Sequence, residues 1–411
     1  MFKFIRSSTL VLLIFAISGC NLINILKLRN ANNDVEPMWT SKGSQFSIKT
    51  NYIGEKTFIY GSINGIDGFK FMVDTGASFT YLFDTPKVTA LNLTKGYGID
   101  LGGWGDEKDS LGHQISMASL KFGELEVKNF QGAFVRMSKT LYFSTSDELI
   151  YDGVIGHDLL HHFVWTFDKK VNQVTVSNKP YIPKSNVQAL PFDTFMSKIS
   201  IKGDISFGNG HQTEHEFIID TGSRHYFKLS SEYPESNNIA LPNAQVTAAD
   251  FGLSGKAEHQ RVTLPKIALG DIQLNNIKTN IIKTDDEDDY WIIGNAVLNQ
   301  FITTIDYQAS TMYLMPYDNQ LFRSRYNLLG LEVRKLLSGN FIVRYVMPNL
   351  SAAKADVKVG GIITDVNGVK AHNISKDQWL SISAAPGKYE ICFARSTCKK
   401  IQSQHIKGYS N

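Results

Sequence analysis

One sequence pattern occurs twice in this chain, and the duplication limits the possible folds more than any other feature. Residues 69–82, FKFMVDTGASFTYL, and residues 215–228, HEFIIDTGSRHYFK, both place Asp-Thr-Gly after an apolar run. The copies stay in step beyond the motif, because a His-Gln pair follows each aspartate by 39 positions. Alternating, hairpin-like stretches come next, at 120–130 and 267–277. Matched landmarks in one order predict two homologous lobes.

The end of the pattern is also repeated and sets the limits of the lobes. Apolar-apolar-glycine elements end at Gly156 and Gly294, and an aspartate follows each glycine by 12 residues. We place lobe 1 at 44–182 and lobe 2 at 183–318, joined by a proline-containing segment. Short runs rich in valine, isoleucine, phenylalanine and tyrosine predict mostly β-structure. The main helices are expected directly after the glycines, at 157–163 and 295–301.

Two lobes with one carboxylate each can bring Asp74 and Asp220 together. Carboxylates about 3 Å apart cannot both ionise readily, so they share a proton and titrate as a pair. One can then act as a general base on water while the other donates to a carbonyl. The glycine after Asp-Thr permits a tight turn, and the threonine hydroxyl can bond across the two loops. Such a pair suits acyl hydrolysis without a nucleophilic side chain or a metal.

Residues 44–318 resemble an aspartic protease. Asp-Thr-Gly-Ala at 74–77 is similar to the retroviral form of the motif, and Asp-Thr-Gly-Ser at 220–223 is nearer to the pepsin form. The resemblance implies a two-lobed pepsin-like and retropepsin-like β-barrel fold, with Asp74 and Asp220 as the catalytic pair. It also implies supporting roles in the active-site loops for Thr75, Gly76, Thr221, Gly222 and Ser223.

The activity implied by this resemblance is that of an endopeptidase without cofactor or metal. An extended peptide or protein substrate would lie in the cleft between the lobes, and water activated between the two aspartates would attack its carbonyl. The main alternative is a catalytically silent peptide-binding protein that retains the protease fold.

Residues beside the motifs depart from the family pattern. Ala77 cannot hydrogen-bond to its neighbouring aspartate as Ser223 can, which predicts inequivalent carboxylates. Arg224 is unusual directly after the second motif, and its side chain is expected to point outward. Turned inward, it would lower the pKa of the pair.

A flap over the substrate is expected from a glycine-rich segment. The candidate is 96–105, GYGIDLGGWG, which would cover substrate through Tyr97 or Trp104. Its counterpart in lobe 2 is 248–255, AADFGLSG. Ordinary surface loops are the alternative.

After a connector at 319–325, residues 326–405 resemble a PDZ domain, which is β-rich with helices. Segment 327–333, NLLGLEV, is similar to the carboxylate-binding loop of that family. The resemblance implies that backbone N–H groups hold the C-terminus of a peptide ligand while the next strand pairs with it. The groups concerned belong to Leu329, Gly330 and Leu331. A PDZ fold kept only for packing against the protease is the alternative.

Residues 1–19 have the features of a signal peptide, with basic residues before an apolar stretch too short to span a bilayer. The run Ile-Ser-Gly-Cys resembles the signal of bacterial lipoproteins. It implies lipidation of Cys20, a tether over 20–43 and attachment to a membrane through the lipid. Because Asn21 is not the aspartate that commonly retains lipoproteins at the inner membrane, we expect the periplasmic face of the outer membrane, in the cell envelope. A plain secretion signal is the alternative.

Other patterns in the chain give weaker signals. His157 and His161 have the spacing of zinc-protease helices and leave a metallohydrolase as a third hypothesis, but the equivalent stretch of lobe 2 lacks both. The acidic run 285–289 lacks the spacing of a calcium loop. Cys392 and Cys398 suit either a disulfide or two free thiols. With 42 basic and 39 acidic residues and no long basic block, nucleic-acid binding is not expected.

Overall fold

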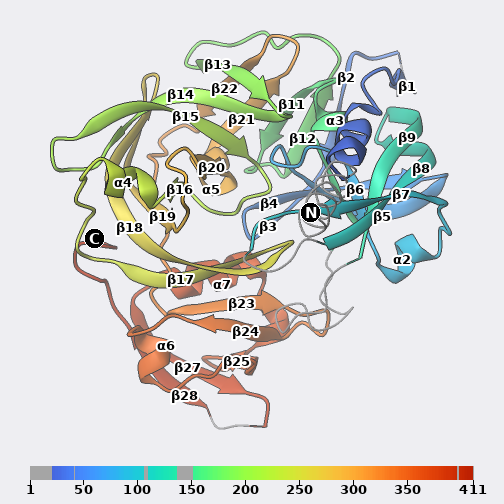
Figure 1. Ribbon diagram of the computed structural model, residues 1–411. Helices are drawn as coiled ribbons and strands as arrows, with labels where there is room; N and C mark the ends of the chain where they lie inside the picture. The colour runs from blue at the N-terminus through green and yellow to red at the C-terminus, as the bar shows by residue number, and fades with distance from the viewer. Residues whose placement is uncertain (1–20, 41, 106–109, 137–150, 396–397, 411) are drawn as a thin grey trace, which may run out of the picture.

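Figure 1 shows the computed structural model of the chain as two β-rich lobes, with a smaller C-terminal domain below them. The structure describes residues 21–40, 42–105, 110–136, 151–395 and 398–410. The signal segment and Cys20 lie outside the described residues.

Within the described part of the chain, no helix is both long and apolar enough to cross a bilayer.

Lobe 1 is built from antiparallel hairpins and closes into a barrel, because β8 pairs with both β4 and β9. The predicted hairpin at 120–130 is confirmed, since β8 and β9 pair through Phe122 and Leu125 around Gly123, which has a φ of +55°. The strands are β1 (Met38–Trp39), β3 (Asn51–Ile53), β4 (Lys56–Ile63), β5 (Ile66–Val73), β6 (Tyr81–Phe83), β7 (Lys95–Leu101), β8 (Ser110–Phe122), β9 (Leu125–Val135) and β10 (Gly153–Ile155). The short helix α2 (Pro86–Thr89) follows β6.

Lobe 2 repeats the barrel of lobe 1. Its order β18-β19-β16-β20-β15-β14 corresponds to β8-β9-β6-β10-β5-β4 in lobe 1, and β18 closes the barrel by pairing with β14. The hairpin predicted at 267–277 is confirmed by the pairing of β18 with β19. The elements are β14 (Lys198–Ser206), β15 (Gln212–Asp220), β16 (Phe227–Ser230), α4 (Glu232–Ser236), β17 (Val246–Gly252), β18 (Gly255–Leu269), β19 (Ile272–Ile282) and β20 (Ile292–Gly294).

The sheet of lobe 2 continues from β14 through β13 into a bridging sheet, which joins the two lobes in the order β13-β22-β21-β11-β12-β2. Its centre is the antiparallel pair β11 and β21, in which Thr166 lies opposite Thr304. These two threonines are equivalent in the repeat, and their hydroxyls are 2.9 Å apart. The duplicated halves therefore meet about a local two-fold axis at this point. The strands are β2 (Gln45–Lys49), β11 (Val164–Asp168), β12 (Gln173–Ser177), β13 (Gln188–Phe195), β21 (Phe301–Asp306) and β22 (Thr311–Pro316).

The helices expected after Gly156 and Gly294 are shorter than predicted: α3 (His157–Leu160) and α5 (Asn295–Leu298). Both helices end alike: a side chain from the bridging sheet donates a hydrogen bond to the carbonyl of the last helical residue. Trp165 donates to the Leu160 carbonyl at 2.9 Å, and Thr303 donates to the Leu298 carbonyl at 3.0 Å. The chain then turns into the bridging sheet.

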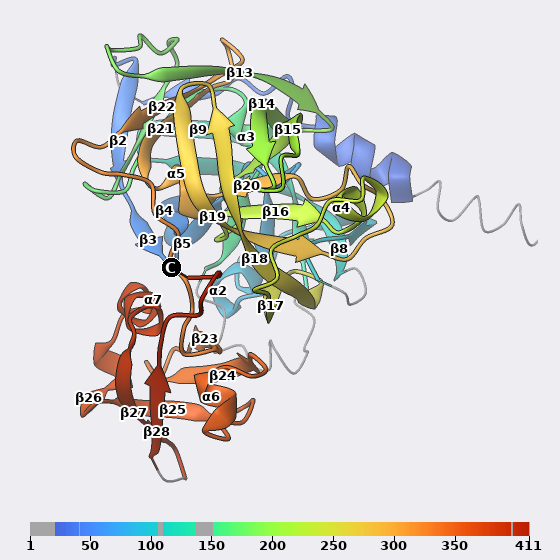
Figure 2. The ribbon, with the colours of Figure 1, turned by 90° about the vertical axis from the view of Figure 1, so that its left-hand side faces the viewer.

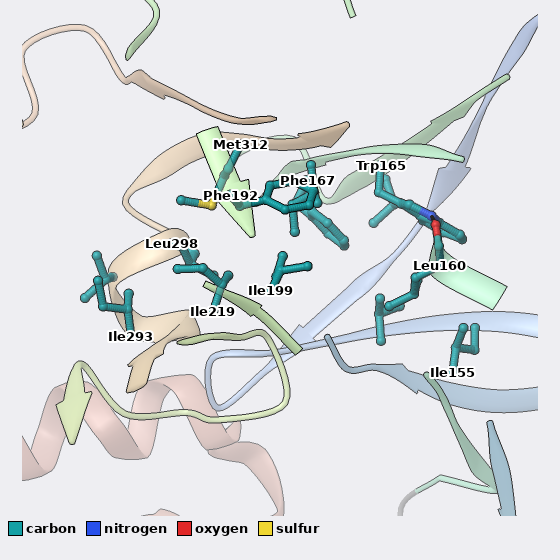
Figure 3. Close-up of a cluster of buried hydrophobic side chains, with 14 of the residues drawn as sticks. Ile155, Leu160, Trp165, Phe167, Phe192, Ile199, Ile219, Ile293, Leu298 and Met312 are labelled. Carbon is teal, nitrogen blue, oxygen red and sulfur yellow. Dashed lines mark hydrogen bonds between the residues drawn. The ribbon is translucent and has the colours of Figure 1, made fainter. Parts of the chain in front are cut away.

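The apolar core runs continuously from one lobe into the other. Figure 3 shows Phe167 of β11 beside Phe192 and Met312 of lobe 2, while Trp165 lies in the same cluster on the side of Leu160. Trp165 is fully buried. Burial of such a side chain contributes roughly 1.5–3 kcal/mol, so the shared core fixes the lobes against one another.

The C-terminal domain is a small sheet with order β23-β24-β25-β27-β28, separate from the sheets of the lobes (Figure 2). The Asn367-Gly368 turn joins β25 to β26, with φ of +52° and +80°. A disulfide links Cys392 to Cys398. The elements are β23 (Leu331–Lys335), β24 (Phe341–Val346), α6 (Ser351–Lys354), β25 (Ile362–Val366), β26 (Val369–Lys370), η2 (Ala371–Asn373), α7 (Lys376–Ala384), β27 (Gly387–Phe393) and β28 (Lys399–Ser403).

Part of the segment assigned to a tether packs against lobe 1. Residues 21–30 are helical, and Leu28 is fully buried. The Asn32 side chain donates to the buried Asp158 carboxylate at 2.9 Å. Asp158 also accepts from the backbone and hydroxyl of Thr80 at 2.8 Å each. This buried carboxylate therefore has a structural explanation.

Candidate active site

The two aspartates of the repeat occupy equivalent positions at the ends of β5 and β15. In each lobe the strand before the aspartate pairs in parallel with the short strand that ends the repeat, β10 or β20. The Asp74 amide donates to the Ile155 carbonyl at 3.0 Å. Backbone N–H groups bind one oxygen of each carboxylate, from Gly76 to Asp74 at 2.8 Å and from Ser223 to Asp220 at 2.9 Å.

The motif glycines lie against the carboxylate of the opposite loop. A Cβ atom at Gly76 would lie 2.7 Å from Asp220 Oδ1 and 2.9 Å from Asp74 Oδ1. A Cβ atom at Gly222 would lie 2.3 Å from Asp74 Cγ. Because real Cβ atoms do not come this close, alanine at either position would push the carboxylates apart. The glycines are what lets the two aspartates face one another.

The two threonines interlock the loops through four buried hydrogen bonds. The Thr75 hydroxyl donates to the Ile219 carbonyl at 2.6 Å and accepts from the Thr221 amide at 3.1 Å. The Thr221 hydroxyl donates to the Val73 carbonyl at 3.0 Å and accepts from the Thr75 amide at 3.0 Å. Each hydroxyl thus reaches the backbone of the other lobe, and the pair of loops is held as one unit.

The glycines that end the repeat support the loops from below. A Cβ atom at Gly156 would lie 2.6 Å from the Phe79 carbonyl oxygen, and one at Gly294 would lie 2.3 Å from the His225 carbonyl oxygen. The helices that follow bind the loops directly, since the His157 amide donates to the Ala77 carbonyl at 2.8 Å. The equivalent bond in lobe 2 runs from Asn295 to the Ser223 carbonyl at 2.7 Å.

The surroundings of Asp74 favour its protonated form. Burial and the neighbouring Asp220 carboxylate raise the pKa of Asp74 to about 7, although Lys198 and Lys56 act in the opposite direction. Within the described residues, the buried Ser223 hydroxyl has no hydrogen-bond partner. The sequence predicted that the two carboxylates differ because the Ser223 hydroxyl binds Asp220 and Ala77 has no such group. In the structure Ser223 binds Asp220 through its backbone amide instead, so this hydroxyl is not the cause of a difference.

The two aspartates open into a cleft of about 760 Å³ that both lobes line. The predicted flap segments lie on opposite sides of its roof and meet at their tips. The Ser254 amide donates to the Trp104 carbonyl at 3.0 Å, and the Gly103 amide donates to the Ser254 hydroxyl at 3.1 Å. Trp104 lines the cleft, whereas Tyr97 packs on the apolar cluster of lobe 1. Of the two predicted covering residues, only Trp104 faces the space above the dyad.

The C-terminal domain forms a third wall of this cleft. Side chains from β23, β24 and α7 line it together with the lobes, and β24 lies beneath β17 (Figure 1). The Arg224 guanidinium, next to the second motif, pairs with Glu332 of β23 at 2.9 Å. The expectation that Arg224 points outward is wrong, because its side chain is 22% exposed and reaches this carboxylate.

Glu332 also belongs to a buried polar network behind the second loop. Arg261 bridges Glu332 at 3.1 Å and Asp250 at 2.9 Å, and His225 lies 2.7 Å from Asp250. Burial would raise the pKa of Glu332, but Arg224 and Arg261 outweigh this effect and hold its pKa at about 2. The network links the loop of Asp220 to the roof hairpin and to the C-terminal domain. This network was not predicted from the sequence.

The predicted peptide-binding loop is already bonded within the domain. The Leu329 amide donates to the Ser383 carbonyl of α7 at 3.3 Å, and the Gly330 amide donates to the Asn327 side chain at 3.0 Å. Leu329 and Leu331 are fully buried. A peptide carboxylate at this loop would therefore have to replace existing bonds. A cavity of about 60 Å³ lies between β23, α7 and the two lobes.

The histidines of the metal hypothesis lie away from the cleft floor, on α3 and its end. Their rings stack 5.1 Å apart, and His161 Nδ1 bonds to the His157 carbonyl at 2.8 Å. The described residues contain no group of three or more histidine, cysteine, aspartate or glutamate side chains that could hold a metal.

Comparison with known families agrees with this architecture. Residues 59–159 match a family model described as aspartyl protease, and residues 320–392 match the PDZ domain family. No curated protein matches the chain. The chain is thus a mostly β protein with an aspartyl protease domain followed by a PDZ domain. The first match covers lobe 1 with Asp74, while the equivalence of lobe 2 rests on the repeat and the strand order.

Proposed function

We propose that this protein is an aspartic endopeptidase that hydrolyses peptide bonds with water activated between Asp74 and Asp220. The observation that carries the proposal is the interlocked pair of Asp-Thr-Gly loops beneath a cleft closed above by two hairpins. A chain that had lost its activity would have no need for glycines that fit only against the opposite carboxylate.

The proposed roles follow from the surroundings of each aspartate. Asp74 carries the proton at and below about pH 7, because burial and Asp220 disfavour its ionised form. It donates this proton to the carbonyl oxygen of the scissile bond. Asp220 takes the part of the general base and accepts a proton from the attacking water. Asp220 then gives this proton to the nitrogen of the tetrahedral intermediate, Asp74 regains a proton from a hydroxyl of the intermediate, and the C–N bond breaks to leave an amine and a carboxylic acid.

The PDZ domain is proposed to assist recognition of the peptide substrate or of a peptide C-terminus. Support comes from its position, because β23, the strand after the predicted carboxylate-binding loop, lines the protease cleft together with α7. We also propose that Cys20 is lipidated and holds the protein in the cell envelope, at the periplasmic face of the outer membrane. Metabolic labelling with a fatty-acid analogue, lost in Cys20→Ala, tests that step.

The experiment for catalysis compares the wild type with Asp74→Asn and Asp220→Asn on a mixed peptide library between acid and neutral pH. The proposal predicts cleavage that is lost in both variants and persists in the presence of a chelator. Cleavage that survives either substitution contradicts it. Peptide binding without cleavage by the wild type would favour the silent receptor instead.

A further inference from the structure

In both lobes, the strand that precedes the aspartate-bearing strand begins with a lysine. Strand β4 starts with KTFIYGSI, at 56–63, and strand β14 starts with KISIKGDI, at 198–205. The sixth residue of each is a glycine that lies against the barrel-closing strand. A Cβ atom at Gly61 would lie 2.6 Å from a carbonyl oxygen of β8, and one at Gly203 would lie 2.8 Å from a carbonyl oxygen of β18. Lys56 and Lys198 are therefore equivalent residues of the repeat.

The strand pairing places each lysine opposite the aspartate of its own lobe. Continued by two residues, the register of the β4–β5 hairpin brings Lys56 opposite Asp74. Continued in the same way, the register of the β14–β15 hairpin brings Lys198 opposite Asp220. Residues directly opposite in an antiparallel pair point to the same face, with Cβ atoms about 5 Å apart. The separations along the chain are 18 and 22 residues, because the second hairpin has the longer turn, so equal spacing does not reveal the pair.

Both lysine side chains line the cleft above the dyad, where they are partly buried. Both also act against the effect of burial on the pKa of Asp74, which shows that their charges face the dyad. Burial lowers the pKa of Lys56 to about 8, and Asp74 opposes the effect, so this side chain is mostly charged at neutral pH. Among the described residues, neither ammonium group has a hydrogen bond or an ion pair. Each lysine brings three N–H donors to the cleft without an acceptor in this part of the chain.

An extended peptide in the cleft would supply the missing acceptors. Its main-chain carbonyls recur at regular intervals on both sides of the scissile bond. Because the repeat relates the two lysines as it relates the two aspartates, the lysines flank the scissile bond on opposite sides. A partly buried ammonium group without an acceptor is costly, so a hydrogen bond to a carbonyl there favours binding.

We propose that Lys56 and Lys198 are a symmetric pair of substrate-binding residues, one on each side of the scissile bond, that donate hydrogen bonds to main-chain carbonyl groups of the peptide. The proposal rests on the proposed peptidase function and adds the residues that hold its substrate. Main-chain carbonyls occur in every peptide, so this contact positions the chain whatever its side chains are.

The test uses the full-length protein and a cleavable peptide that has only neutral side chains and blocked termini. At a pH where the wild-type rate does not vary with pH, Lys56→Gln and Lys198→Gln should each raise KM about tenfold and leave kcat nearly unchanged, because a contact to the bound substrate is lost. Lys202→Gln is the matched control and should leave KM unchanged, since Lys202 lies on the same strand as Lys198 but is exposed and does not line the cleft. An unchanged KM in both test variants overturns the inference.

Arginine variants separate the loss of a donor from altered packing. Lys56→Arg and Lys198→Arg keep N–H donors at both positions and should stay within about threefold of the wild-type KM. Arginine variants that bind the peptide as weakly as the glutamine variants would contradict the proposed hydrogen bonds.

Shortened peptides locate the two contacts. Removal of residues from one side of the scissile bond should abolish the response to one of the two glutamine substitutions, and removal from the other side should abolish the response to the other. If both shortened peptides respond to both substitutions as the full peptide does, the lysines act on the dyad rather than on the peptide, and the inference is wrong.

Binding of the same peptide to Asp220→Asn, followed by fluorescence anisotropy, separates this inference from the proposed function. Addition of Lys56→Gln or Lys198→Gln to that variant should weaken binding about tenfold, even where no turnover is found. Equal affinity with and without the lysines refutes the inference, while cleavage by the wild type would still support the peptidase.

Discussion

Replacement of one interlocking threonine by valine tests the active-site geometry most directly. Valine has nearly the shape of threonine, so Thr221→Val leaves no large cavity but removes the hydroxyl. The Thr75 amide and the Val73 carbonyl, both bonded by that hydroxyl in a buried setting, then lose their partner. Each unsatisfied buried group costs about 1–3 kcal/mol, so we expect a loss of about 2–5 kcal/mol in the free energy of unfolding.

The repeat provides internal controls for this prediction. Thr75→Val removes the equivalent pair of bonds, to Ile219 and to the Thr221 amide, and should cost the same within about 1 kcal/mol. Thr221→Ser retains the hydroxyl and loses only a methyl group, with an expected cost of roughly 1 kcal/mol. Urea unfolding followed by tryptophan fluorescence measures the differences, provided that the transitions keep the same slope.

Activity gives a second readout of the same change. Because the interlock sets the relative position of the carboxylates, we expect kcat of Thr221→Val to fall roughly 100-fold, with a smaller change in KM. Thr221→Ser should keep most of the activity. The reasoning would be refuted if Thr221→Val and Thr221→Ser had equal stability and equal kcat. It would also be refuted if Thr75→Val and Thr221→Val differed strongly in their loss of free energy of unfolding.

Two further predictions concern charged groups around the dyad. Glu332→Gln removes the shared partner of Arg224 and Arg261 and should cost about 3 kcal/mol in urea unfolding, since it leaves buried cations uncompensated. Folding lowers the pKa of Glu332 from 4.5 to about 2. The loss in the free energy of unfolding should therefore be complete above about pH 4.5 and should vanish as the pH falls through about 2. A loss that does not depend on pH would contradict the pairing of Glu332 with the two arginines. Lys198→Gln removes a cation that lowers the pKa of Asp74, so the alkaline limb of the kcat/KM profile, expected near pH 7, should move up by roughly half a pH unit. A limb that stays in place or moves down would show that Asp74 does not carry the essential proton.

The sequence predicts those parts of the fold that the duplication repeats. Equivalent strands, hairpins and short helices recur at equivalent positions, because each lobe needs the same barrel beneath its loop. The symmetry also brings Thr166 against Thr304 and Thr75 against Thr221, so one copy predicts the contacts of the other. The helices α3 and α5 are shorter than predicted because side chains of the bridging sheet bind their last carbonyls. Such contacts between distant segments cannot be recognised in the local sequence.

The charged network behind Asp220 illustrates what local patterns could not show. Asp250 and Arg261 lie on the β17–β18 hairpin, whereas Glu332 belongs to a separate domain, and no spacing along the chain connects that domain to the hairpin. The Lys198 side chain, which influences the pKa of Asp74, lies at the start of β14 in the other lobe. Contacts of this kind depend on packing that only the folded chain determines.

A comparison of the two lobes nevertheless contains a signal for the docking of the PDZ domain. Relative to Asp74 and Asp220, His225 stands where lobe 1 has Phe79, and Lys228 stands where it has Leu82. After the repeated His-Gln pair, Arg261 stands where lobe 1 has an isoleucine. All three polar side chains are buried.

Polar and charged groups at positions that are apolar in the sister lobe require partners, because an unpaired buried polar or charged group is costly. Lobe 2 supplies Asp250 for this purpose, and the PDZ domain supplies Glu332. The departures from symmetry therefore mark the surface on which the third domain sits. They also explain why the Asp220 loop is tied to that domain through Arg224, whereas Phe79 and Leu82, which follow the Asp74 motif, are buried in apolar clusters.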